Sequence, residues 1–243
     1  MGSKFFNLII ICGLLLISTT VTAQTESESR FLVGIDFITG FPQNEFKDNV
    51  KNTGFGLAGE FLYHIPNSPL FVGAGLNFLV YGTQSRREAI SPNIPDLTVE
   101  VRNSNNIFLG DVILRAQPFS GNSIRGVNPY VEGLFGFNYL WTETTIDDED
   151  WDDDDTDFSS TNYSDTALNY GVGAGIMFKI MDGKDDSDLQ SLYLDINVRY
   201  MFGEKAKYLK KGGIILHENK VTYDPSESTT DLILPRIGVT MVF

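Results

Sequence analysis

The residues of this chain that could do chemistry are mostly charged, and one group of them is spaced at even intervals among apolar residues. It holds five acids and four bases, which are Asp36, Glu60, Asp111, Glu132, Asp195, Arg115, Lys179, Arg199 and Arg236. Charges enclosed in a protein must be paired or hydrated, because their desolvation is otherwise prohibitive. We therefore predict an interlocked ion-pair network that fills the interior of the molecule.

A second group is a run of carboxylates, with ten acids and no base between Glu143 and Asp157. Such a run repels itself and stays solvated, which predicts a surface loop. Clustered carboxylates also attract Ca²⁺, so weak calcium binding or bridging to lipopolysaccharide phosphates is the alternative. The run lacks the glycine and the ligand spacing of an EF-hand. Its candidate calcium ligands are Asp147, Asp148, Glu149, Asp150, Asp152, Asp153, Asp154, Asp155 and Asp157.

Catalysis has little support in the sequence. The histidines are His64 and His217, and His217-Glu218 with Ser226 or Ser228 would be needed to imitate a nucleophile activated by a base. That spacing is not diagnostic. The chain shows no zinc spacing, redox pair or phosphate-binding glycine loop. We predict no catalytic residue, no cofactor and no dedicated metal site, and therefore no enzymatic activity.

The elements that carry these charges are strands in which apolar residues alternate with polar ones. In residues 31–41, Phe31, Val33 and Ile35 share one face, while Gly34 and Asp36 share the other. The same period of two recurs in eight segments, and it is the signal of half-buried strands. The segments are residues 31–41, 54–65, 70–82, 106–119, 128–144, 167–180, 192–202 and 229–243.

The connections between these segments alternate in length. Long connections follow the odd strands, at residues 42–53, 83–105, 145–166 and 203–230, and short ones follow the even strands, at 66–69, 120–127 and 181–191. Outer-membrane barrels have short periplasmic turns and longer external loops. This rhythm predicts four external loops and two periplasmic chain ends. Gly212-Gly213 further suggests that the last two strands extend outward as a hairpin.

Aromatic residues stand near the ends of the predicted strands, on the apolar face. Phe41, Phe55, Phe108, Trp141, Tyr170 and Phe202 would mark the outer rim, and Phe31, Tyr63, Phe178 and Phe243 the inner rim. Rings at both membrane interfaces are the girdles expected of a membrane barrel. The interior of an eight-stranded barrel is just wide enough for side chains to fill it. The predicted charge network would therefore plug the barrel.

The N-terminus predicts export from the cytoplasm. Lys4, an apolar stretch from Phe5 to Ser18 and Val21-Thr22-Ala23 form the three parts of a secretory signal, so residues 1–23 are expected to be cleaved and residues 24–243 to form one domain. The single cysteine, Cys12, lies inside the signal. The net charge of −14 argues against nucleic-acid binding, which needs a basic surface.

The signal, the eight alternating segments and the closing residues Val239-Thr240-Met241-Val242-Phe243 resemble the small outer-membrane β-barrel family. That family includes the OmpA-type transmembrane domain and the porin-family barrels of Bacteroidota. The resemblance implies an all-β, eight-stranded, antiparallel, up-and-down transmembrane barrel in the bacterial outer membrane. It also implies that the barrel-assembly machinery reads the terminal Phe243, and that outer-membrane lipid and lipopolysaccharide surround the barrel.

We therefore expect a structural or adhesive role through four extracellular loops. The rival functions are a small porin that passes solutes, a soluble lipocalin-like barrel that binds a ligand, and a lipid-modifying enzyme. In the lipocalin-like case the apolar face would line a cavity and the charged face would meet water. The alternation by itself leaves open which face points outward.

Overall fold

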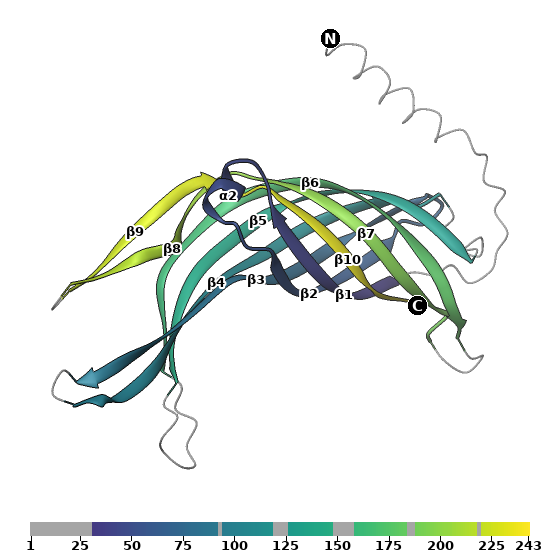
Figure 1. Cartoon of the computed structure of the whole chain (residues 1–243). Helices are drawn as coiled ribbons and strands as arrows, with labels where there is room; N and C mark the ends of the chain where they lie inside the picture. The colour runs from purple at the N-terminus through teal and green to yellow at the C-terminus, as the bar shows by residue number, and fades with distance from the viewer. Residues whose placement is uncertain (1–30, 92–93, 119–125, 148–157, 184–187, 218–219) are drawn as a thin grey trace, which may run out of the picture.

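The computed structural model describes residues 31–91, 94–118, 126–147, 158–183, 188–217 and 220–243. They form ten strands and one short helix (Figure 1). The elements are β1 (Phe31–Pro42), α2 (Asn44–Asn49), β2 (Gly54–His64), β3 (Leu70–Ser91), β4 (Ile94–Ala116), β5 (Val127–Asp147), β6 (Phe158–Asp182), β7 (Ser191–Gly203), β8 (Lys205–His217), β9 (Lys220–Thr229) and β10 (Leu232–Val242). Among these residues, no helix is long and apolar enough to cross a membrane.

Eight of the strands close into an antiparallel barrel in the order β1-β10-β7-β6-β5-β4-β3-β2. Neighbours in sequence are neighbours in the barrel, and β10 returns to pair with β1. At this seam, Phe31 and Phe243 each donate a backbone N–H to the other's carbonyl oxygen, at 3.2 and 2.9 Å. The predicted eight-stranded, up-and-down barrel is thereby confirmed, because closure leaves neither edge of the barrel sheet unpaired.

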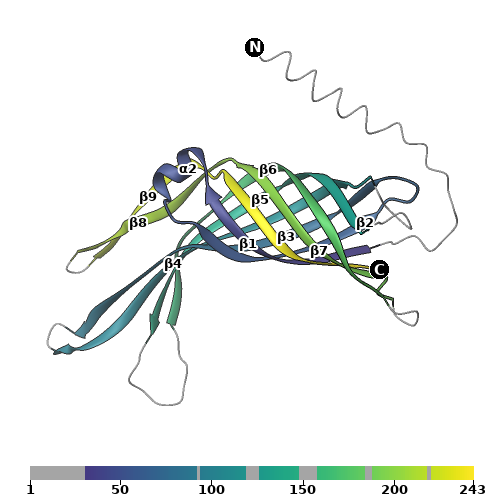
Figure 2. The same ribbon diagram turned by 45° about the vertical axis from the view of Figure 1, so that its right-hand side comes forward.

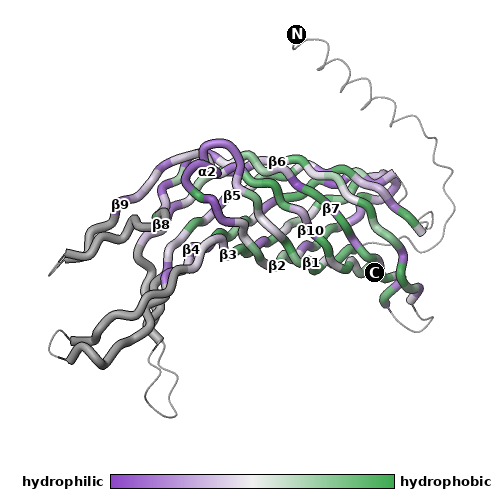
Figure 3. The backbone as a smooth tube through the Cα atoms, in the orientation of Figure 1, coloured by the Kyte–Doolittle hydropathy of each residue, from purple (hydrophilic) through white to green (hydrophobic). Residues whose placement is uncertain are grey.

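The predicted faces are also confirmed by burial. In β1, Asp36 is 3 % exposed whereas its neighbours Ile35 and Phe37 are 56 % and 49 % exposed. Figure 3 shows the same alternation of apolar and polar residues along the other barrel strands. The apolar residues that flank the charged ones along each strand therefore point away from the barrel axis, and the charged ones point into it. A lipocalin-like arrangement, with an apolar cavity and a charged exterior, is excluded by these exposures.

The two ends of the barrel differ. We call the end that holds Phe31, Phe243 and the short turns the terminal end, and the opposite end the projecting end. At the projecting end, β3 with β4 and β5 with β6 continue beyond the barrel, and the hairpin β8–β9 extends as well (Figures 1 and 2). The longer connections thus share one end, as the sequence predicted.

All four predicted long loops contain regular structure, since residues 145–147 and 158–166 of the third one belong to β5 and β6. Residues 83–105 do not form a loop, because β3 and β4 remain paired from Thr83 with Ser104 to Ser91 with Ile94. Residues 42–53 contain the helix α2. Residues 203–230 contain the separate hairpin β8–β9, where the sequence had suggested an extension of β7 and the last strand. These segments are rich in polar residues, which is why the sequence analysis assigned them to loops.

Candidate functional site

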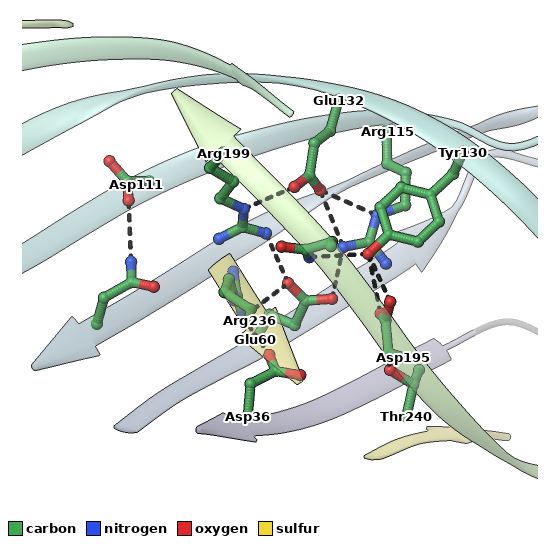
Figure 4. Close-up of polar contacts among 12 residues, drawn as sticks. Asp36, Glu60, Asp111, Arg115, Tyr130, Glu132, Asp195, Arg199, Arg236 and Thr240 are labelled. Carbon is green, nitrogen blue, oxygen red and sulfur yellow. Dashed lines mark hydrogen bonds and ion pairs between the residues drawn. The ribbon is translucent and has the colours of Figure 1, made fainter. Parts of the chain in front are cut away.

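The interior of the barrel holds a closed ring of ion pairs. Arg115 donates to Glu60 Oε1 at 2.6 Å and, from Nε and Nη2, to Glu132 Oε2 at 3.1 and 2.9 Å. Arg199 donates to Glu132 Oε1 at 2.6 Å and to Glu60 Oε2 at 2.8 Å. The charges alternate around the ring, so each carboxylate contacts two guanidinium groups (Figure 4). We call Glu60, Arg115, Glu132 and Arg199 the ion-pair ring.

A second pair extends the ion-pair ring across the seam of the barrel. Arg236 on β10 pairs with Asp36 on β1, and its Nη2 also lies 3.4 Å from Glu60 Oε2. The six charged residues come from six of the eight barrel strands. All of them are at most 5 % exposed. Alternating buried charges of this kind stabilise one another only when the set is complete, since removing one partner leaves the other uncompensated.

Glycine makes room for the ion-pair ring on the strands that contribute no charge to it. A Cβ added to Gly173 on β6 would lie 2.8 Å from Glu132 Oε1 and 3.0 Å from Arg199 Cγ. Any side chain there would displace the ring. The glycines that alternate along β6 therefore give the charged side chains of β5 and β7 space to meet in a narrow interior.

The other predicted network residues lie elsewhere. Lys179 is not in the network but pairs with Asp182 near the terminal end, where β6 shifts register between Lys179 and Met181. Asp195 accepts hydrogen bonds from Tyr130 at 2.8 Å and from Thr240 at 3.3 Å. Asp111 accepts one from Asn77 at 3.1 Å. Neither aspartate has an ion pair among the described residues.

Tyr130 contributes to this site although the sequence analysis did not select it. Its hydroxyl donates to Asp195, and the Arg115 guanidinium lies 4.0 Å from the centre of its ring. A cation over an aromatic face is attracted by the ring quadrupole. The sequence did indicate this position, because Tyr130 stands two residues before Glu132 in an alternating strand and must share its inward face.

Apolar side chains fill the interior on both sides of the ion-pair ring. Towards the projecting end they are Ile38, Leu79, Ile107, Leu109, Leu140, Met201, Leu232 and Leu234, and towards the terminal end they are Leu32, Leu62, Phe71, Met177, Tyr193 and Val242. Each of these residues is at most 3 % exposed. The charges are therefore enclosed between two layers of buried side chains, where the low dielectric strengthens their mutual attraction.

A cap closes the projecting end. Phe46 of α2 is fully buried, and its ring packs edge-on against Tyr208 and Tyr81 at centroid distances of 5.2 and 5.8 Å. Asn44, which has a φ of 49°, donates its side-chain amide to Asp231 at 2.6 Å. Burial raises the pKa of the Tyr208 hydroxyl above its ordinary value, and that hydroxyl lies 2.7 Å from Ser228 Oγ. We call Phe46, Tyr81 and Tyr208 the aromatic cap.

The remaining candidate residues are not assembled into a site. His64 is buried near the terminal end, with Nε2 2.8 Å from the Ser68 carbonyl oxygen, whereas His217 ends β8 on the projecting side. They do not come together. Of the candidate calcium ligands, residues 148–157 lie outside the described residues, and of Asp147 only the backbone is described, in β5. The described residues contain no group of three or more metal-binding side chains.

The outward face carries rings near both ends of the barrel strands. Tyr170 and Phe202 stack at 5.2 Å towards the projecting end, and Phe31 stacks on Phe61 at 5.5 Å at the terminal end. Between them the outward face is mostly aliphatic, with Phe37 and Phe135 among its exposed residues. An apolar band with an aromatic girdle on either side matches the two interfaces of a bilayer.

Comparison with known proteins gives a family and a set of similar folds. A family model described as the outer membrane protein beta-barrel domain matches residues 10–180. Neisserial surface protein A is 14% identical, with a TM-score of 0.42 over 90% of this chain and 100% of that one. The N-terminal barrel domain of Pseudomonas aeruginosa OprF is 12% identical, with a TM-score of 0.37 over 89% and 100%.

Two further solved structures extend this set. The attachment invasion locus protein Ail of Yersinia pestis, in complex with a heparin analogue, is 14% identical, with a TM-score of 0.34 over 90% of this chain and 100% of that one. A major outer membrane protein from Thermus thermophilus is 14% identical, with a TM-score of 0.42 over 88% and 99%. None of the curated proteins matches the chain.

Proposed function

Because the chain belongs to the outer membrane protein beta-barrel family, we propose that it is a plugged, non-conducting outer-membrane barrel whose projecting end acts at the cell surface. The observation that carries this proposal is the filled interior. Its ion-pair ring lies between two apolar layers, and each ring residue is at most 5 % exposed. An open channel needs a continuous polar, hydrated lumen, which usually takes more than eight strands.

Conductance measurement tests the plug. Full-length protein folded into planar bilayers is expected to give no steady conductance, and a porin reconstituted in the same bilayers is the positive control. A stable, reproducible conductance step that scales with the number of inserted barrels would overturn the proposal and favour a porin that passes solutes. Incorporation is checked independently by the altered electrophoretic mobility of the unheated, folded barrel.

The orientation we propose places the terminal end in the periplasm and the projecting end outside. The chain has one cysteine, Cys12, in the predicted signal, so single cysteines can be introduced into the mature barrel without background. Lys207→Cys, at the projecting end, is expected to react with a membrane-impermeant maleimide on intact cells. Asp182→Cys, exposed at the terminal end, is the matched control and should react only after the cells are opened. The reverse pattern would contradict the orientation.

The surface role that we propose is structural or adhesive and acts through the projecting hairpins. The hairpin β8–β9 can be removed at its base, because Thr230 N donates to Gly203 O and brings its two ends together, and Tyr208 of the aromatic cap is removed with it. Replacing residues 204–229 by a tight Asn-Gly turn should leave the barrel folded. Cells that carry this variant are expected to attach to surfaces or to one another less than wild-type cells. Equal attachment by an equal amount of assembled barrel would count against the role.

Two contacts with the envelope complete the proposal. The exposed Lys205 and Lys207 are suited to lipopolysaccharide phosphates, although exposed ion pairs contribute little individually. Phe243, the residue that follows the closing strand β10, is suited to recognition by the barrel-assembly machinery. A Phe243→Ser variant is expected to accumulate unassembled in cells yet refold normally in detergent. Normal assembly in cells would remove Phe243 from this role.

A catalytic role is not part of the proposal. The two histidines cannot share a site, because His64 is buried at the end of β2 near the terminal end, far along the barrel from His217. His217→Ala is accordingly expected to leave the lipid composition of the membrane unchanged. An altered lipid A or phospholipid profile that depends on His217 would reverse this conclusion.

A further inference from the structure

The ladder between β1 and β10 has a gap at Pro235, inside β10. The register places Thr39 opposite Pro235, yet no pair joins these two described residues or the next two, Gly40 and Leu234. The pairing of β10 with β7 continues through Pro235, opposite Val198. The gap is therefore confined to the side of β10 that faces β1.

The missing hydrogen bond is the one that Pro235 would donate. Phe31 and Phe243 exchange both of their backbone hydrogen bonds across the seam. Hydrogen-bonded positions alternate along an antiparallel ladder, and Thr39 is an even number of residues from Phe31, so Thr39 and Pro235 also stand at such a position. Proline has no N–H, so the Thr39 carbonyl oxygen lacks the donor that any other residue type would supply.

Pro129 on β5 shows how a barrel strand can hold a proline without this loss. Lys179 N donates to Gly126 O, so every second residue from Gly126 faces β6 and Pro129 faces β4. The pairing of β5 with β4 extends only to Val131. The nitrogen of Pro129 thus lies beyond the end of its partner strand, whereas Pro235 has β1 beside it.

Thr39 adds a second polar group at the gap. Its side chain is half-buried on the outward face, between the exposed rings of Phe37 and Phe41. Among the described residues, its hydroxyl has no hydrogen-bond partner. The other outward residues of these two strands are apolar, from Phe31, Val33 and Ile35 on β1 to Ile237, Val239 and Met241 on β10. A carbonyl acceptor and a hydroxyl therefore meet at one point of a face that otherwise offers lipid only hydrocarbon.

The gap lies just inside the aromatic girdle of the projecting end. The next outward row in that direction holds the rings of Phe41 and Tyr200. Girdle rings lie at the level of the lipid headgroups. Two residues along a tilted strand correspond to about 5 Å of membrane depth. The Thr39 carbonyl is therefore at the depth where acyl chains are joined to their headgroups.

A backbone carbonyl without a donor is costly in lipid, so the missing partner of Thr39 is most usefully a lipid group. Ester-linked acyl chains bring only acceptors to this depth. An amide linkage brings an N–H, and a hydroxylated chain brings an O–H. We propose that the gap at Thr39 and Pro235 binds a lipid whose acyl linkage carries such a donor, and that this donor bonds to the Thr39 carbonyl. The orientation proposed above places this lipid in the outer leaflet.

Two kinds of vesicle that differ in one lipid test the site. Phosphatidylcholine has no hydrogen-bond donor, whereas sphingomyelin has the same headgroup and presents an amide N–H and a hydroxyl at the depth of its acyl linkage. The full-length barrel is unfolded in urea in phosphatidylcholine vesicles with and without sphingomyelin of matched chain length. Sphingomyelin is expected to raise the ratio of folded to unfolded wild type by about two- to tenfold, the effect of one net hydrogen bond.

Pro235→Ala separates the site from a general effect of the bilayer. Alanine restores the N–H that completes the ladder, so the variant should fold and should be equally stable in both kinds of vesicle. Pro129→Ala is the matched control and should respond to sphingomyelin as the wild type does, because the nitrogen of Pro129 faces no partner strand. Both leaflets of the vesicles contain sphingomyelin, so the result does not depend on which end of the barrel lies outside the cell.

A measurement on the folded wild type locates the hydrogen bond itself. When the threonine carbonyls are labelled with ¹³C, the Thr39 resonance is identified by its absence from Thr39→Val. It should shift when sphingomyelin is added to the wild type and stay in place in Pro235→Ala. An unmoved Thr39 resonance in the wild type would overturn the proposal and leave water as the partner of the carbonyl. A gain in stability from sphingomyelin that is equally large in Pro235→Ala would also overturn it.

Discussion

Arg115 and Glu132 face each other directly across β4 and β5, and two guanidinium nitrogens of Arg115 donate to the same carboxylate oxygen, Oε2, at 3.1 and 2.9 Å. The pair is completely enclosed. Its value to the protein depends on the whole ion-pair ring, because each ring residue is shared between two partners.

Arg115→Ala should therefore destabilise the barrel strongly. The change leaves Glu60 and Glu132 facing only Arg199 and Arg236, and breaking a buried ion pair typically costs about 3–5 kcal/mol. Urea unfolding in lipid vesicles measures the loss. Lys207→Ala, which removes an exposed pair 3.9 Å from Glu227, is the control and should change the free energy of unfolding by less than about 1 kcal/mol. Equal effects would show that the ion-pair ring adds no stability.

A charged side chain introduced on the outward face of the barrel should lower its stability. Val172, in the middle of the membrane-spanning part of β6, is 61 % exposed, so Val172→Arg would place a guanidinium in lipid. The expected loss of stability in a bilayer is about 2–4 kcal/mol. Ser164→Arg, on the same strand beyond the membrane, should cost about 0–1 kcal/mol. If both variants were neutral, the apolar face would not be meeting hydrocarbon.

Phe46→Ala should open the cap while the barrel stays closed. The ring is fully buried against Tyr81 and Tyr208, and removing such a side chain costs about 3–5 kcal/mol of local packing. Trypsin is expected to cleave after Lys47 and Lys51 much faster in the variant than in the wild type. Phe46→Leu, which keeps most of the apolar volume, should be cleaved at an intermediate rate. Unchanged cleavage in Phe46→Ala would mean that α2 is held by its polar contacts alone.

Two glycine substitutions should differ sharply. An added Cβ at Gly203 would overlap the Thr230 hydroxyl and lie 2.8 Å from Asn138 Nδ2, whereas one at Gly133 meets nothing within 4 Å. Gly203→Ala is expected to lower the free energy of unfolding by about 1–3 kcal/mol, as overpacking does. Gly133→Ala should be neutral or slightly stabilising. Comparable urea midpoints for the two variants would show that Thr230 and its neighbours can move aside.

The cap should also loosen in strong alkali. Because burial raises the pKa of Tyr208 above 10.0, the folded cap holds the phenolic proton more firmly than the unfolded chain does. Stability from this source is complete below about pH 10 and falls as the pH rises through the folded pKa. The rate of proteolysis in α2 should rise over that range. Tyr208→Phe, which cannot ionise, should show a weaker rise, and an identical profile would assign the effect to another group.

The barrel strands were predictable because they bury one face and expose the other to lipid. Apolar and polar residue types then alternate with a period of two, as in Ile35, Asp36 and Phe37. The same rule would have identified Tyr130 as an inward residue. It also correctly placed Glu60, Arg115, Glu132 and Arg199 on the inward face.

The parts that could not be predicted are those where apolar and polar residues do not alternate over the length of a strand. β3 and β4 continue to Ser91 and from Ile94 in polar sequence. α2 carries one buried residue, Phe46. The pairing of residues within the ion-pair ring could not be predicted either. Glu60 and Arg199 stand on strands that are not neighbours in the barrel, and they meet only through its curvature. Lys179 was misplaced because a register shift at the end of β6 breaks the alternation.

The pairing of Arg236 with Asp36 and Glu60 has a consequence for biogenesis. Asp36 and Glu60 belong to the first two strands to be synthesised, and Arg236 belongs to the last. A nascent chain that stops short of β10 would leave these carboxylates in the barrel interior with too little positive charge, which disfavours premature cyclisation of seven strands. We therefore expect Arg236 to favour closure of the complete set of eight strands over closure of a shorter one.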